Sequence, residues 1–529
     1  MRIHLKSRLA VWLSTCLLAA SGCTTGRPAA EPAGEQGLAQ FVEVVSDTSV
    51  LGPDSDFIGS PLPDVGADGL FPVHGPDACG IAVLEGGEAS FAMRMDVLKK
   101  ATRSIRIQAL VFKGDEAGLR IAEVLKEKKA AGLDVRVIVD AFSNPWLQTQ
   151  WLFFDLKQHG IEVEGYEALA LQWINEIPIP FVEPHYDPAQ PNKRFHEKMW
   201  IIDGETDDGV AVTGGLNIGN EYFRTDPDHP DNYWRDQDIV VRGKVVGDLV
   251  AAFDRNFDYF VGVKESRGIF NTNRYWEATR KVLDATGKIP VSYETDETIV
   301  ARVAALEAAP PRPRFRPAKC RFFQNRPRLA ETYIQQAYVK LIERAEREVL
   351  IANAYFVPTP SMSKVLRDAA MRCVSVRIIS NSPQTNDLPE ISLVGRGHYA
   401  ELLAVNETPE VRGCTAEGAG LRIWEWVGQA ADEEVRHQGT MHSKFAVFDG
   451  RRSLVGSYNL DPRSERLNSE TAVVFDEPAL SRRLREKLLE EDLRFAREVT
   501  PEMAAGYEAP GDVIERFRQS IGYLFEDSL

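Results

Sequence analysis

The fold of this 529-residue chain is decided by a nine-residue stretch that occurs twice, as FHEKMWIID at residues 195–203 and as MHSKFAVFD at residues 441–449. Each copy sets a histidine, a lysine two positions later and an aspartate seven positions later in an apolar, strand-like run. A short segment ending in asparagine follows each copy, GGLN at 214–217 and GSYN at 456–459. From ordinary residue frequencies, two such matches should arise by chance in far fewer than about one chain in a thousand. The sequence therefore predicts two related halves.

The stretches before the two copies share an order of elements. In the first half we expect a helix over 92–103, a strand over 105–112, a helix over 116–131 and a strand over 135–140. In the second half we expect a helix over 333–347, a strand over 349–356, a helix over 361–371 and a strand over 374–380. Apolar, β-branched strands that alternate with helices are typical of α/β proteins. Chance similarity of generic βαβ units is the alternative, and the paired motifs argue against it.

The spacing within each motif indicates which side chains act together. Side chains two positions apart in a strand share a face, so each histidine points the same way as its lysine. The two aspartates, Asp203 and Asp449, have the opposite parity. We interpret these aspartates as structural residues that hold the turn after the strand.

The paired residues suit the cleavage of a phosphodiester, which is anionic and slow to react. Lysines and asparagine amides can surround the non-bridging oxygens, one neutral imidazole can attack phosphorus, and the other can protonate the leaving alcohol. A structural role for each histidine is the alternative. Metal binding is disfavoured because a cation accompanies each histidine, and we expect no metal and no cofactor. The predicted catalytic residues are His196, Lys198, Asn217, His442, Lys444 and Asn459.

These motifs resemble the phospholipase D superfamily, in which HxKxxxxD with a downstream GxxN occurs twice in single-chain members. Three further stretches are similar to bacterial cardiolipin synthases of the shorter, non-transmembrane type: LNIGNEYF at 216–223, WRDQD at 234–238, and SNSP at 380–383 with Asn386-Asp387. The resemblance implies an α/β fold of two phospholipase D-type lobes, each a mostly parallel or mixed sheet flanked by helices, with the active site at the lobe interface.

The resemblance also implies further roles. In the superfamily an acidic residue beyond each GxxN orients a catalytic imidazole, and aligning the following strands places Asp236 opposite Glu470, with Asp238 as the fallback. Solvated carboxylates at strand ends are the alternative. The histidine of the first motif is usually the nucleophile, which implies that His196 forms a phosphohistidine and His442 is the general acid.

The N-terminus has the features of an export signal. Three basic residues precede an apolar stretch over 9–20, and LAASGC at 18–23 resembles a bacterial lipobox, although Ala20 replaces the usual leucine. Cleavage before Cys23 would leave an exported, membrane-anchored lipoprotein in the cell envelope, on the periplasmic side. The net charge of −16 becomes −19 without the three signal charges, so nucleic acid is not an expected partner.

Composition divides the rest of the chain. We expect a signal over 1–23, a flexible tether over 24–76, a first lobe over 77–285, a Pro-rich linker over 286–320, and a second lobe over 321–529 ending in a helical tail. An apolar stretch at 168–182 lines an acyl-chain groove, dips into lipid or packs in the core. Four cysteines remain beyond the anchor, in a spacing that fits no zinc site, and their pairing stays open: Cys79, Cys320, Cys373 and Cys414.

The leading interpretation is a membrane-associated phosphatidyltransferase similar to cardiolipin synthase. Its expected substrates are phosphatidylglycerol and, as a second candidate, phosphatidylethanolamine, presented at a membrane surface. A phospholipase D that transfers the same group to water is the nearest rival, because the motifs are shared. An exported nuclease is a weaker alternative because the chain is acidic, and an inactive lipid- or wall-binding lipoprotein is weaker because both motifs are complete.

Overall fold

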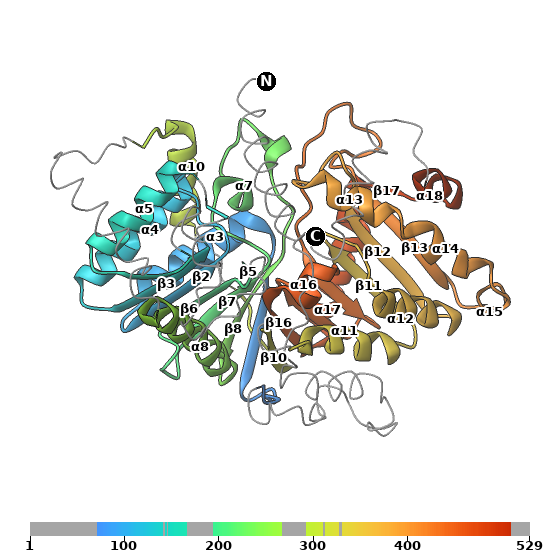
Figure 1. Ribbon diagram of the computed structural model, residues 1–529, viewed down its shortest axis with the longest axis horizontal. Coiled ribbons are helices and arrows are strands. Elements are labelled where there is room, and N and C mark those ends of the chain that lie inside the picture. The colour runs from blue at the N-terminus through green and yellow to red at the C-terminus, as the bar shows by residue number, and fades with distance from the viewer. Residues whose placement is uncertain are drawn as a thin grey trace, which may run out of the picture.

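The computed structural model describes residues 71–140, 143–144, 146–166, 194–266, 293–309, 313–326 and 331–508. Two lobes lie side by side, each built on one β-sheet with helices packed against it (Figure 1). The predicted signal, most of the predicted tether, the apolar stretch at 168–182 and the end of the helical tail lie outside the described residues.

The first lobe holds one sheet in the order β4-β3-β2-β6-β7-β8-β1-β9. Its strands are β1 (Cys79–Leu84), β2 (Ser104–Ala109), β3 (Asp134–Asp140), β4 (Glu162–Tyr166), β6 (Met199–Ile202), β7 (Val210–Gly214), β8 (Asp238–Gly243) and β9 (Arg316–Pro317). Its helices are α3 (Gly86–Lys100), α4 (Glu116–Ala130), α5 (Leu147–Gln158), α7 (Asn220–Phe223), the 3₁₀ turn η2 (Pro230–Asn232), α8 (Val245–Ser266) and α10 (Glu297–Ala308).

The second lobe holds a sheet in the order β10-β16-β15-β14-β11-β12-β13-β17, and β5 of the first half (Arg194–Phe195) pairs with β16. Its strands are β10 (Lys319–Asn325), β11 (Glu348–Asn353), β12 (Ser375–Asn381), β13 (Gly420–Trp426), β14 (Lys444–Phe448), β15 (Arg452–Gly456), β16 (Asn468–Asp476) and β17 (Ala496–Glu498). Its helices are α11 (Tyr333–Glu343), α12 (Pro360–Met371), α13 (Pro389–Arg396), α14 (Tyr399–Leu403), η5 (Ala404–Glu407), α15 (Pro409–Arg412), α16 (Pro462–Arg466), α17 (Pro478–Glu486), the π-helical η6 (Lys487–Glu491), η7 (Asp492–Phe495) and α18 (Pro501–Glu508).

Both sheets are mixed in the same way. Strands β2, β3 and β4 run parallel, as do β11, β12 and β13, because a helix carries the chain back between successive strands. The motif strands β6 and β14 lie antiparallel to β2 and β11, and the following strands continue antiparallel. The predicted α/β fold of two similar lobes with mixed sheets is therefore confirmed.

Two boundaries differ from the sequence prediction. The predicted linker over 286–320 contains α10, which packs on α3 and α4, and β9, which pairs with β1. The end of the predicted tether is part of the core, since Phe71 is buried against Phe322, Phe323 and Tyr333. The sequence prediction missed both contacts because local composition does not report packing between residues that are far apart in the sequence.

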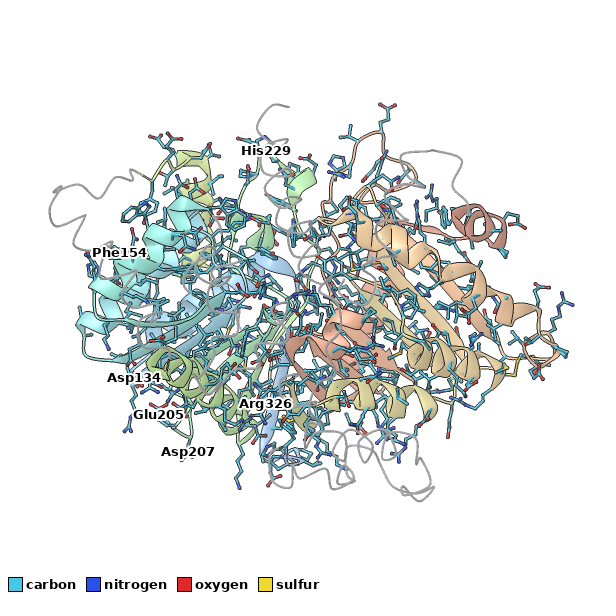
Figure 2. All side chains as sticks on the ribbon, in the orientation of Figure 1. Asp134, Phe154, Glu205, Asp207, His229 and Arg326 are labelled. Atoms are coloured by element: carbon cyan, nitrogen blue, oxygen red, sulfur yellow. A yellow bond between two sulfur atoms is a disulfide. The ribbon has the colours of Figure 1, made fainter. Side chains whose placement is uncertain are left out.

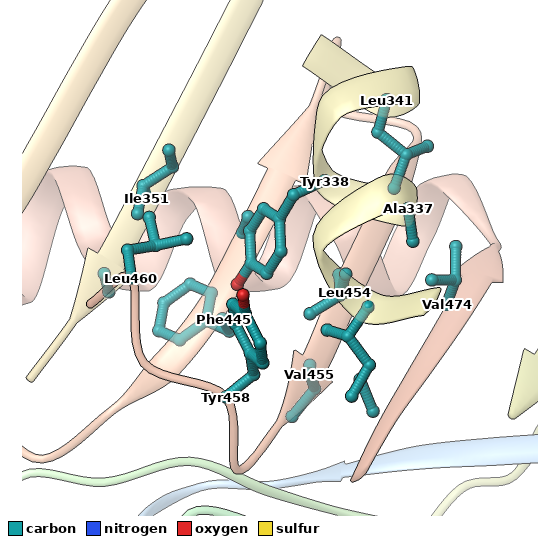
Figure 3. Packing of buried hydrophobic residues seen from close by; sticks show 14 of the residues in the cluster. Ala337, Tyr338, Leu341, Ile351, Phe445, Leu454, Val455, Tyr458, Leu460 and Val474 are labelled. Carbon is teal, nitrogen blue, oxygen red and sulfur yellow. The ribbon is translucent and has the colours of Figure 1, made fainter. Parts of the chain in front are cut away.

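Side chains fill the faces of both sheets (Figure 2). One cluster lies under α3, α4 and α5 in the first lobe. A second cluster is continuous across the lobes and contains Val241 and Phe253 of the first together with Phe322 and Val473 of the second. Figure 3 shows part of it, where Tyr338 and Leu341 of α11 lie over Leu454 and Val474. Among the described residues, no helix is both long and apolar enough to cross a bilayer.

Candidate active site

The start of the first motif pairs with a strand of the second lobe. Residues Arg194 and Phe195 form β5, which runs parallel to the start of β16, and the His196 N–H donates to the Ser469 carbonyl at 2.9 Å. The chain then enters β6 in the middle of the first sheet. The Lys198 ammonium donates to the His196 carbonyl at 2.6 Å, which fixes the lysine beside the imidazole.

The second motif makes the reciprocal crossing. Met441 forms a parallel bridge with Arg235 of the first lobe, and the His442 N–H donates to the Arg235 carbonyl at 2.7 Å. The Lys444 ammonium donates to the His442 carbonyl at 2.5 Å. Because each motif is held by the opposite lobe, both histidines and both lysines converge at the interface, where all four are buried.

Each imidazole is held by a carboxylate of the other lobe. The Nδ1 atom of His196 lies 2.9 Å from a carboxylate oxygen of Glu470, and Nδ1 of His442 lies 2.7 Å from one of Asp236. The fallback residue Asp238 has a different partner, since it accepts hydrogen bonds from Arg94 at 2.5 Å and Ser90 at 2.6 Å. Aligning the two halves by sequence identified both carboxylates. It could not show that each one pairs with the histidine of the opposite half.

The motif aspartates hold backbone turns. Asp203 accepts hydrogen bonds from the N–H groups of residues 102–104, and Asp449 accepts them from residues 346–348. Both aspartates have positive φ values, 50° and 55°, in the left-handed region. They tie each motif strand to the start of the neighbouring β2 or β11, away from the reacting groups.

The two asparagines are buried but are not held alike. Asn217 accepts a hydrogen bond from the Val111 N–H at 3.1 Å and donates to the Tyr222 hydroxyl at 3.1 Å. The side-chain oxygen of Asn459 is buried and has no hydrogen-bond partner among the described residues. A polar atom left in this way is available to a bound group.

The pair of His196 and Glu470 has a firmly ionised carboxylate. Burial opposes ionisation of Glu470, but His196, Lys198 and the Ser457 hydroxyl together hold its pKa below the ordinary value. Ser457 and Ser464 donate to Glu470 at 2.5 and 2.8 Å. Burial lowers the pKa of His196 to about 4 against the attraction of Glu470, so this imidazole is neutral at pH 7.

The pair of His442 and Asp236 is balanced differently. Burial raises the pKa of Asp236 to about 7, an effect that Lys444 opposes and Asp238 reinforces. Burial, Lys444 and Lys198 together hold the pKa of His442 well below its ordinary value. The second pair can therefore retain a proton on its carboxylate side near pH 7, whereas the first pair keeps its carboxylate charged.

The two lysines concentrate positive charge between the imidazoles. Burial lowers the pKa of Lys198 to about 7 and that of Lys444 to about 8, although nearby carboxylates oppose both shifts. An anionic phosphate placed here would replace the lost solvation of both ammonium groups. Within the described residues, no cluster of three or more His, Cys, Asp and Glu side chains could hold a metal ion.

Several residues of the site were missed by sequence reasoning. Ser464 and Asn468 contact Glu470, and three aromatic rings surround His442. Two of those rings, Tyr222 and Trp234, lie within stretches already singled out for their resemblance to cardiolipin synthases. The sequence thus pointed to these two residues, but it did not show that their rings contact His442.

Comparison with known proteins agrees with this geometry. The family model described as "Cardiolipin synthase, PLD-like domain" matches residues 95–259 and again 338–492. A cardiolipin synthase of Geobacillus thermodenitrificans is 27% identical over 74% of this chain and 61% of its own length. A probable cardiolipin synthase of Bacillus subtilis is 27% identical over 85% of this chain and 72% of its own length. This chain thus spans less than two thirds of the Geobacillus relative.

A solved structure shows the same fold. The phosphatidylserine synthase of Haemophilus influenzae superimposes with a TM-score of 0.56, covering 87% of this chain and 97% of that one at 16% identity. The family model covers more than half of the chain, in two copies, and each copy contains one histidine–lysine motif. The chain is therefore an enzyme of the phospholipase D superfamily, with two PLD-like domains of the cardiolipin synthase kind.

Proposed function

We propose that the protein is a phosphatidyltransferase that forms cardiolipin from phosphatidylglycerol through a phosphohistidine intermediate. The observation that carries this proposal is the exchanged pairing of His196 with Glu470 and His442 with Asp236, around two buried lysines. Similarity to cardiolipin synthases supports the choice of substrate.

In the first half-reaction, Nε2 of neutral His196 attacks phosphorus and the bond to the headgroup oxygen breaks. Ionised Glu470 stabilises the positive charge that develops on the imidazole. His442 gives a proton to the departing glycerol oxygen, and Asp236 resupplies it through Nδ1. The two lysines neutralise the non-bridging oxygens throughout.

In the second half-reaction, the terminal hydroxyl of another phosphatidylglycerol attacks the phosphohistidine. His442 accepts the hydroxyl proton, the phosphorus–nitrogen bond breaks, and His196 is restored. Two phosphatidylglycerol molecules thus give one cardiolipin and one glycerol. Water in place of the lipid alcohol would give phosphatidic acid, the product of the rival phospholipase D.

The product mixture tests the proposal. The purified protein is incubated with phosphatidylglycerol vesicles, and the lipids are identified by mass spectrometry. Cardiolipin in excess of phosphatidic acid supports the transferase, whereas phosphatidic acid alone would establish the hydrolase. The double variant His196→Ala, His442→Ala is the control for contaminating activity.

We also propose that the enzyme is exported and anchored through Cys23 to a membrane of the cell envelope. Two disulfides support export, because they join all four cysteines that follow the anchor: Cys79 with Cys320 and Cys373 with Cys414. We expect Cys23→Ser to move the protein into the soluble fraction. Membrane association of that variant in high salt would reject the lipid anchor.

A further inference from the structure

The two halves of the active site can be compared position by position. In the first half the Lys113 N–H donates to the Ile218 carbonyl, and in the second the Val357 N–H donates to the Leu460 carbonyl. These matching bonds make Val111 the counterpart of Tyr355. Counting from the motif asparagines and from the carboxylates gives the other counterparts: Ser464 for Tyr222, and Asn468 for Trp234.

The comparison exposes one consistent difference around the histidines. The Trp234, Tyr222 and Tyr355 rings lie 5.0, 5.7 and 6.4 Å from the His442 ring. No aromatic ring of a described residue is in comparable contact with His196, whose half has valine, serine and asparagine at the same positions. The two halves share their reacting groups but not their surroundings.

A carboxylate lies at the outer side of the aromatic half. The Tyr355 hydroxyl donates to both oxygens of Asp387 at 2.8 Å, and Asp387 is exposed to solvent. The Lys444 ammonium lies 5.9 Å from the centre of the Tyr355 ring, so this ring already contacts a cation. Burial and Asp387 both favour the protonated hydroxyl by raising the pKa of Tyr355.

The charge beyond the rings is negative in sum. Lys113 interacts electrostatically with Asp387, but it is ion-paired with Glu221 and also faces Asp115. Lys444 also acts electrostatically on Asp387, so three carboxylates face two ammonium groups and one negative charge is in excess. Electron-rich ring faces next to surplus negative charge bind an organic cation more favourably than a neutral polyol.

The geometry of in-line displacement decides which part of the substrate lies beside His442. With His196 as the nucleophile, the alcohol oxygen that leaves or attacks lies opposite it, against His442. We propose that Tyr222, Trp234, Tyr355 and Asp387 form a headgroup subsite that prefers alcohols bearing an ammonium group. This inference rests on the proposed phosphatidyl transfer and extends it to the choice of alcohol.

A competition between two small alcohols tests the preference. Phosphatidylglycerol vesicles are the donor, and ethanolamine and ethylene glycol, which are similar in size, compete as acceptors at equal concentration and neutral pH. We expect the ethanolamine product to exceed the glycol product by roughly tenfold. The ratio is internal to one sample, so partial misfolding of a variant does not change it.

Two matched variants assign the effect. Asp387→Asn should lower the product ratio strongly but leave the smaller preference that the rings provide, and Tyr355→Phe, which releases Asp387 but keeps the ring, should lower it less. Asp231→Asn, a carboxylate three residues before Trp234, should leave the ratio unchanged. A wild-type ratio near one, or a ratio that Asp387→Asn does not alter, would overturn the inference while any phosphatidyl product still upholds the transfer chemistry.

A binding measurement separates the two proposals. Choline is titrated into wild-type protein and into Asp387→Asn while tryptophan fluorescence is recorded. Saturable quenching that weakens at least about fivefold in the variant supports the subsite even if no phosphatidyl transfer is detected. Equal quenching of both proteins, or none, counts against it.

Discussion

At the scale of single residues, the two imidazoles differ in how their carboxylates are supported. Glu470 accepts hydrogen bonds from two serine hydroxyls and stays ionised, whereas Asp236 has fewer donors and a pKa raised by burial to about 7. A charged partner stabilises a phosphorylated imidazole, and a partner that retains a proton suits a general acid. This asymmetry favours His196 as the nucleophile, which sequence similarity had implied.

The assignment predicts which variant traps the intermediate. In His442→Ala, breakdown of the phosphohistidine should slow because the acceptor hydroxyl loses its base, so a phosphatidyl adduct accumulates on His196. His196→Ala should form no adduct. Intact-mass measurement after acid quench distinguishes these results, and an adduct mapped to His442 in the wild-type enzyme would reverse the assignment.

The buried lysines predict how the rate depends on pH. Both must be charged to bind the phosphate, and they lose charge as pH rises through about 7 for Lys198 and about 8 for Lys444. His196 must be neutral, which holds above its pKa of about 4. We therefore expect kcat/KM to be highest between roughly pH 5 and 7 and to fall above that range.

The two kinetic parameters should separate in this experiment. Bound phosphate favours charged lysines, so the decline of kcat should lie at higher pH than the decline of kcat/KM. A soluble phosphodiester avoids changes in the vesicle surface with pH. A kcat/KM that stays constant to pH 10 would contradict the lysine assignment.

At the scale of elements, the sequence predicted single strands better than their pairing. The apolar motif runs that form the antiparallel strands β6 and β14 were expected, whereas the parallel strands β4 and β13 were not. Strands β2, β3, β11 and β12 are apolar runs next to amphipathic helices, a local pattern. The pairing of β5 with β16 and of Arg235 with Met441 depends on residues more than two hundred positions apart. Local patterns therefore gave the catalytic residue types but not the exchange of carboxylates.

The turn after β7 explains why the two motifs differ, with Gly215 where the second has Ser457. A Cβ atom on Gly215 would lie 2.1 Å from the Asp236 carboxylate, whereas Ser457 donates to the longer Glu470. We expect Gly215→Ser to displace Asp236 from His442 and lower kcat/KM at least about 100-fold.

The reciprocal change is the control for this prediction. Ser457→Gly removes one hydrogen bond to Glu470 without a clash, so the loss should be smaller, about tenfold. Steady-state kinetics and circular dichroism of both variants separate a catalytic defect from unfolding. Equal losses would mean that the turn does not position Asp236.

At the scale of the whole molecule, the lobes are parts of one structure. Their shared cluster joins α8 and β8 of the first lobe to β10 and β16 of the second. A buried ion pair between Arg235 and Asp492 adds a second connection, with a distance of 2.7 Å. Cysteine spacing could not reveal the pairing of Cys79 with Cys320, because the two residues are 241 positions apart and lie on strands of different sheets, β1 and β10.

The two disulfides should therefore contribute unequally to stability. The bond between Cys79 and Cys320 closes a sequence separation of 241 residues and links the lobes, whereas that between Cys373 and Cys414 closes 41 within the second lobe. In the chain-entropy model, the longer loop makes the first disulfide more stabilising than the second by roughly 1.5 kcal/mol. Replacing Cys79 and Cys320 by serine should lower the urea midpoint more than replacing Cys373 and Cys414, with a single unfolding transition in both cases because the core is shared. Midpoints that are equal or reversed, or a separate early transition of one lobe, would show that the lobes are stabilised independently of this link.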